Sequence, residues 1–235
     1  MSQGTAADRQ LFVSGDIRSI PFGELRPMCS NVFEWLVAGV LFKLFRMPAP
    51  LQFATESRRL LSVNAEQVPK RLMNYFDGLR PQAEPLGYQI NHYATIPAVG
   101  PIAIALMTMS EPAGQSCFYA VRVALKVNDS ITDDGHFGFN SCLADDELLS
   151  TITYAKLPKP RPGMDRKIIK TTDVNALHKE HRNRMMGKRI TPVHPSQWFA
   201  IAEKHNRLET DDLLQRRVTR LATPGEVARI RSQTG

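Results

Sequence analysis

The chain has 235 residues, of which 43% are hydrophobic and 23% are charged, close to the average of globular proteins. This composition excludes a wholly disordered chain, a collagen-like fibre and a membrane protein with several spans. The net charge of +7 is uneven, because residues 151–235 carry a net +10 and residues 91–150 a net −5. A basic surface favours acidic partners such as anionic lipid, nucleic acid or an acidic protein face.

Residues 1–27 show no sustained hydrophobic period and are expected to form a mobile leader. Met28 is an alternative start of translation, in which case this leader is not made. The three cysteines lack the CxxC spacing of a zinc knuckle, and a reducing cytoplasm fits them best. We therefore expect a cytoplasmic protein, which would be peripheral to the membrane if it docks there.

Residues 28–48 contain the most apolar segment, and a helix is predicted over 32–47. Asn31 provides an N-cap, while the prolines at 48 and 50 end the helix. The uninterrupted apolar run, residues 35–42, is too short to cross a bilayer, which needs about 20 residues.

Two interpretations of this helix remain open: burial in the protein core, or docking to an anionic membrane or a protein partner. In the docking interpretation, the aromatic side chains enter the membrane interface and the basic side chains meet anionic lipid headgroups. The candidate docking residues are Trp35, Phe42, Phe45, Lys43 and Arg46.

Residues 49–235 are predicted to form a single α+β domain with a proline-rich connector at 158–163. Apolar residues recur at helical spacing over 64–79 and then alternate with a period of two from residue 87 onwards. The fold expected is an antiparallel sheet of about five strands in a meander. Two helices precede this sheet, and two to four helices follow it and pack on one face. Asp134-Gly135 is predicted to be a tight turn between two strands.

Two clusters could carry chemistry. Asp133, Asp134 and His136 could act as acid and base or hold a cation, although a hairpin turn explains these residues more simply. His178 and His181 lie three residues apart on a predicted helix and could share a metal ion. A solvated helix face is the simpler interpretation of the two histidines, and no cofactor is predicted.

The sequence favours a non-enzymatic binding domain that docks to an anionic membrane surface or a protein partner through its N-terminal hydrophobic helix. The first alternative is a small-molecule enzyme, or a ligand-sequestering domain with a pocket between helices and sheet. The second alternative is nucleic-acid binding through the basic residues 151–235. It is disfavoured because acidic residues interrupt the basic groups and no nucleic-acid-binding motif is present.

Overall fold

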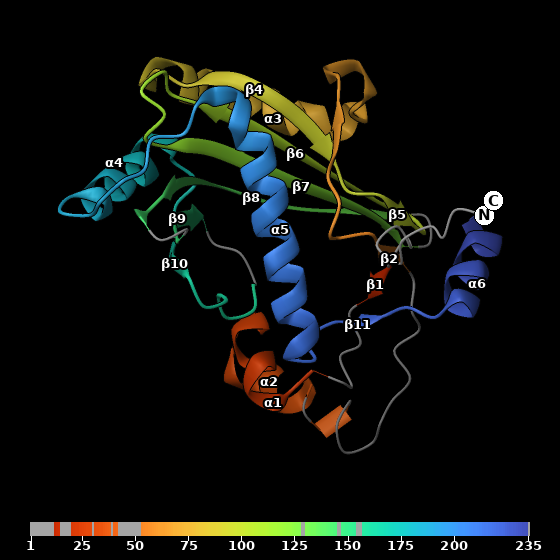
Figure 1. Ribbon diagram of the computed structural model, residues 1–235. Helices are drawn as coiled ribbons and strands as arrows, with labels where there is room; N and C mark the ends of the chain where they lie inside the picture. Colours follow the sequence, from red (N-terminus) through yellow and green to blue (C-terminus); the bar gives the residue numbers. More distant parts are fainter. Residues whose placement is uncertain are drawn as a thin grey trace, which may run out of the picture.

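The computed structural model describes residues 12–14, 20–29, 31–38, 40–41, 53–127, 130–144, 147–153 and 157–234. Helices and β-sheets both build the fold, which confirms the α+β class (Figure 1). The helices are α1 (Phe22–Leu25), α2 (Val32–Ala38), α3 (Lys70–Ala83), α4 (Val174–Met185), α5 (Trp198–Gln215) and α6 (Pro224–Thr234).

A seven-stranded sheet forms the centre of the molecule, with strand order β10-β9-β8-β7-β6-β4-β3. Its strands are β3 (Leu61–Val63), β4 (Gln89–Thr95), β6 (Ile102–Ser110), β7 (Cys117–Val127), β8 (Ser130–Cys142), β9 (Leu148–Thr153) and β10 (Met164–Ile169). Neighbouring strands pair antiparallel except β9 and β10, which are parallel. The predicted five-stranded antiparallel meander is therefore wrong in its strand number and at this edge. A parallel neighbour requires a long connection, and residues 154–163 separate these two strands.

The predicted turn at Asp134-Gly135 is also wrong, because both residues lie within β8. They pair with Val123 and Arg122 of β7, and this pairing continues to Val127 and Ser130. A Cβ atom at Gly135 would lie 2.8 Å from the Val121 carbonyl oxygen, so this glycine permits a close approach of two strands. Continuous pairing along β7 thus overrides the local preference for a turn.

The two faces of the sheet are covered by different helices, so the prediction that the helices pack on one face is wrong. Helices α3 and α4 pack on one face around a core that includes Phe76, Phe118 and Phe139. Helix α5 crosses the other face (Figure 1). Because side chains alternate along a strand, β7 contributes Phe118 to the first face and Tyr119 to the second.

A second, four-stranded sheet has the order β11-β1-β2-β5. Its strands are β1 (Val13–Ser14), β2 (Ala54–Thr55), β5 (Ala98–Val99) and β11 (Arg220–Leu221). Strand β1, within the segment expected to be a mobile leader, is buried and pairs with β11 and β2. Helix α6 packs beside this sheet through Val227 and Ile230. Thr223 and Glu226 form a capping box at the start of α6.

Helix α2 forms the first part of the segment predicted to be helical over 32–47, of which residues 32–38 and 40–41 are described. Asn31 Oδ1 accepts a hydrogen bond of 2.7 Å from the backbone N–H of Glu34, which confirms the predicted N-cap. Residues 42–47 lie outside the described residues. None of the described helices is long and apolar enough to cross a membrane.

Candidate functional site

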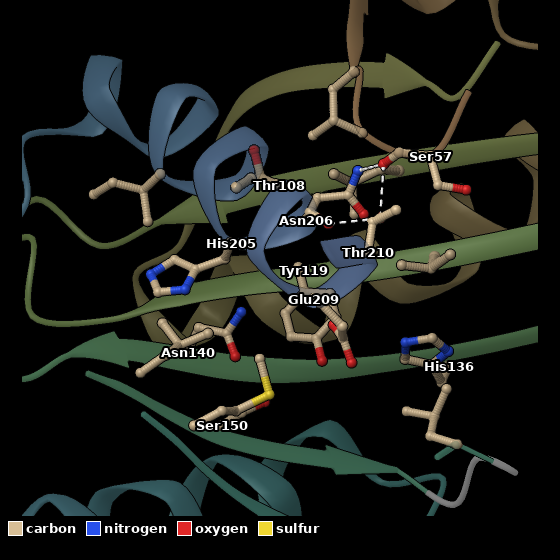
Figure 2. Close-up of a pocket in the computed structure, with 18 of the residues that line it drawn as sticks. Ser57, Thr108, Tyr119, His136, Asn140, Ser150, His205, Asn206, Glu209 and Thr210 are labelled. Atoms are coloured by element: carbon tan, nitrogen blue, oxygen red, sulfur yellow. Dashed lines mark hydrogen bonds between the residues drawn. The ribbon is translucent and has the colours of Figure 1, made fainter. Parts of the chain in front are cut away.

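A cavity of about 360 Å³ lies between the seven-stranded sheet and α5 (Figure 2). This volume is at the lower end of the range for small-molecule sites, roughly 300–1,000 Å³. Strands β6 to β10 form its floor, α5 forms its roof, and the loop at Ser57 closes one side. Most of the lining is aliphatic and aromatic, which suits an apolar ligand.

Tyr119 lies near the middle of the floor, where its position depends on a glycine. Its cross-strand partner on β8 is Gly138, at which a Cβ atom would lie 2.6 Å from the Thr151 carbonyl oxygen. Because Gly138 has no side chain, the Tyr119 ring can extend over β8 toward Ser150 of β9. Burial raises the pKa of the Tyr119 phenol, which therefore stays neutral at physiological pH.

Three polar residues, here called the polar row, face each other across neighbouring strands. Asn140 of β8 lies opposite Ser150 of β9, which in turn lies opposite Arg166 of β10. The Arg166 side chain is only 5% exposed, and its Nη1 atom lies 3.3 Å from Glu209 Oε1 of α5. It also donates a hydrogen bond to the Pro158 carbonyl oxygen. The positive charge of the Arg166 guanidinium is therefore balanced by Glu209, and the group already donates to acceptors of the protein.

The opposite side of the floor, formed by β6 and the neighbouring part of β7, is apolar apart from Thr108. Leu106 and Val121 lie opposite each other there, and Ile96 and Ile104 extend the same surface. The cavity is therefore amphipathic, with the polar row on β8 to β10 and mostly hydrocarbon on β6, the neighbouring part of β7 and Ile96.

The histidines of the lining are neutral. Burial lowers the pKa of His136 to about 4, and the Arg166 cation adds to this effect against the opposing Asp134 carboxylate. The Nδ1 atom of His205 receives a hydrogen bond from Arg161, which can only donate, so this imidazole is also uncharged. With Arg166 and Glu209 compensating each other, the described lining carries no net charge at neutral pH.

Hydrogen bonds hold α5 in place over the cavity. Asn206 and Thr210, one turn apart, both donate to the Ser57 carbonyl oxygen. An ion pair of 2.5 Å between Arg58 and Asp211 ties the same loop to the same helix. The roof of the cavity is therefore fixed at the end where it meets the loop (Figure 2).

The structure does not bring the predicted acid–base cluster together. His136 lies in the cavity, edge-on to Tyr119. Asp133 points to the opposite face, where it pairs with Arg71 at 2.7 Å and with Arg122 at 3.5 Å. Asp134 is exposed, and its Oδ1 accepts from the backbone N–H of Gly135.

The two histidines of α4 also serve separate contacts. Both ring nitrogens of His181 lie 2.9 Å from a hydroxyl group, that of Ser141 for Nε2 and that of Thr151 for Nδ1. His178 packs edge-on against Tyr88. His181 is fully buried, so the interpretation of a solvated helix face is wrong for it. The described residues contain no group of three or more His, Cys, Asp and Glu residues that could hold a metal ion.

Among the predicted docking residues, only Trp35 lies within the described part of the chain. Its ring lies 4.2 Å from that of Phe22, and its Nε1 donates to the Phe22 carbonyl oxygen. The other four, Phe42, Lys43, Phe45 and Arg46, lie outside the described residues.

Several arginines of the basic C-terminal third are engaged in ion pairs. Arg184 pairs with Asp165, and Arg216 with both Glu24 and Asp212. Arg182 pairs with the buried Glu111 in the same way. These arginines hold structural elements together rather than forming a free basic surface.

Most polar residues of the cavity were not predicted from the sequence: Tyr119, Asn140, Ser150, Arg166 and Glu209. One usable signal exists, because the alternation along β7 places a tyrosine between apolar residues on a single face. Comparison of the chain with protein-family models, curated proteins and solved structures gives no match.

Proposed function

We propose that this protein binds a small, mostly apolar molecule in the cavity between the seven-stranded sheet and α5. The observation that carries the proposal is a cavity of about 360 Å³ with an amphipathic lining and no net charge. Protein interiors are packed to high density and contain few voids larger than a water molecule, so a space of this size indicates a binding site.

Binding can be tested with N-phenyl-1-naphthylamine, a neutral probe whose fluorescence rises in apolar surroundings. We expect saturable binding and a higher melting temperature with the probe. Val121→Trp, which fills the apolar side of the cavity, should weaken probe binding at least tenfold. Leu125→Trp is the matched control, because Leu125 lies on the same face of β7 outside the cavity.

A milder variant keeps the test decisive if Val121→Trp does not fold. Ala202→Leu extends a side chain into the cavity from the half-buried face of α5. Probe binding that is unchanged in both folded variants, or absent in the parent protein, would overturn the proposal.

We also infer that α2 docks to an anionic bilayer surface. None of its described side chains is buried, and six large apolar side chains of this region are at least 38% exposed. They are Phe22, Val32, Phe33, Leu36, Val37 and Val40. Two basic residues, Lys43 and Arg46, follow in the sequence and favour anionic lipid as the occupant.

Flotation of the full chain with vesicles tests this docking. We expect flotation with vesicles that contain phosphatidylserine and little with pure phosphatidylcholine. The double variant Phe33→Ser, Leu36→Ser should stay in solution. The control pair Ile131→Ser, Ile168→Ser removes similarly exposed apolar side chains elsewhere and should still float. Equal flotation of both double variants would exclude α2 as the docking element.

A further inference from the structure

Two buried polar atoms at the cavity have no hydrogen-bond partner among the described residues. One is the acceptor Oδ1 of Asn140 and the other is the donor Nε1 of Trp198. Both residues line the cavity, and Trp198 is only 3% exposed. An unpartnered buried polar atom is costly, so each such atom in a native structure requires an explanation.

Asn140 and Trp198 line the same part of the cavity. Trp198 packs in one cluster with Cys117, and Cys117 is the direct cross-strand partner of Asn140. The nearby Arg166 is already engaged with Glu209 and Pro158. Among the fully buried atoms of the described lining, one acceptor and one donor therefore remain unpartnered.

A hydroxyl group is the smallest group that satisfies both atoms, because it donates one hydrogen bond and accepts others. A carboxylate or an ether cannot donate to Asn140. An ammonium group cannot accept from Trp198, and it would bring an unbalanced charge into an uncharged lining.

From this pairing we propose that the ligand is a neutral, mostly apolar alcohol. Its hydroxyl group donates to Asn140 and accepts from Trp198, and its hydrocarbon part lies toward Leu106 and Val121. This inference rests on the proposed binding function of the same cavity.

Trp198 provides a local readout. The chain has two tryptophans, so the variant Trp35→Phe leaves Trp198 as the only one. The full chain with this substitution is titrated with 1-decanol, decyl methyl ether, decanoate and decylamine, and the Trp198 emission is followed. We expect 1-decanol to bind at least tenfold more tightly than its methyl ether, because the ether leaves Asn140 unpaired.

The variant Asn140→Leu has a similar side-chain volume and removes the acceptor. We expect it to weaken 1-decanol binding about tenfold and to leave the ether unchanged. Asn74→Leu, at an exposed position of α3, is the matched control. If Asn140→Leu does not fold, the ratio of alcohol to ether affinity in the Trp35→Phe protein decides the question alone.

The outcomes separate the two proposals. If none of the four compounds binds, and N-phenyl-1-naphthylamine does not bind either, the cavity function itself is wrong. If alcohol and ether bind equally, the cavity function stands, and the hydroxyl assignment is overturned in favour of water at the two atoms. Tightest binding of decanoate or decylamine also overturns the assignment and indicates a charged ligand.

Discussion

The two faces of the seven-stranded sheet are built from the same strands and differ in how completely they are filled. Toward α3 and α4, aromatic residues such as Phe76, Phe118 and Phe139 are completely buried in one continuous core. Toward α5, alternate residues of the same strands surround a cavity of about 360 Å³. Successive side chains of one strand therefore point alternately into the packed core and into the cavity.

We interpret this difference as a division of roles, in which one face provides stability and the other binds a ligand. On the filled face, both ring nitrogens of His181 are hydrogen-bonded, although Asp133 Oδ1 and Arg122 Nε are buried there without a partner among the described residues. On the hollow face, Asn140 and Trp198 retain unpartnered atoms within the described structure. We infer that the packed core on the filled face stabilises the sheet, while the less densely packed hollow face leaves space for a ligand.

The largest expected effect comes from truncating the filled face. Phe139→Ala removes a completely buried ring and should lower the free energy of unfolding by about 3–5 kcal/mol. Leu106→Ala on the hollow face should cost less, about 2 kcal/mol, because Leu106 is half-buried and already borders empty space. Urea denaturation of both variants measures the difference, and equal losses would contradict the contrast between the faces.

Local sequence patterns predicted those parts of the fold that depend on residues close together in the sequence. The N-cap at Asn31 is confirmed, since its Oδ1 accepts from the backbone N–H of Glu34. The alternation along β7 also correctly groups Cys117, Tyr119 and Val121 on one face.

The errors arise where distant segments decide the structure. The Asp134-Gly135 turn failed because pairing with β7 continues through it. The cavity was not predictable in detail, because Arg166 and Glu209 are 43 residues apart and meet only when α5 crosses the sheet. The general expectation of a pocket between helices and sheet stays a proposal for function, although a cavity does lie in that position.

Acid should destabilise both faces through their neutral histidines. Burial lowers the pKa of His181 on the filled face to about 3, and that of His136 in the cavity and of His92 beside it to about 4. In the unfolded chain these groups have a pKa of about 6.5, so the unfolded state binds more protons as the pH falls below that value.

Each histidine should therefore reduce the free energy of unfolding by up to about 1.4 kcal/mol per pH unit between pH 6.5 and its folded pKa. Stability is highest above pH 6.5 and declines well before carboxylates titrate. Urea denaturation at pH 7 and pH 5 measures the loss, and His136→Gln should make the dependence less steep. A free energy of unfolding that is constant between pH 7 and pH 5 would show that the histidines are not held neutral.

The smallest effect compares two neighbours on β8 that point to opposite faces. Ser141 on the filled face hydrogen-bonds with His181, so Ser141→Ala should cost about 1 kcal/mol. Asn140→Leu on the hollow face replaces an unpartnered acceptor with a side chain of similar size. It should raise the free energy of unfolding by about 1 kcal/mol, since an unsatisfied buried polar atom costs roughly 1–3 kcal/mol.

The sign of the Asn140→Leu effect is the informative part of this comparison. A gain in stability, together with loss of the preference for an alcohol over its methyl ether, would mean that Asn140 is kept at the expense of stability because a ligand needs it. If Asn140→Leu instead lowers the free energy of unfolding as much as Ser141→Ala does, the Asn140 side chain is as well hydrogen-bonded as that of Ser141. Asn140 would then give no support for a bound hydroxyl group.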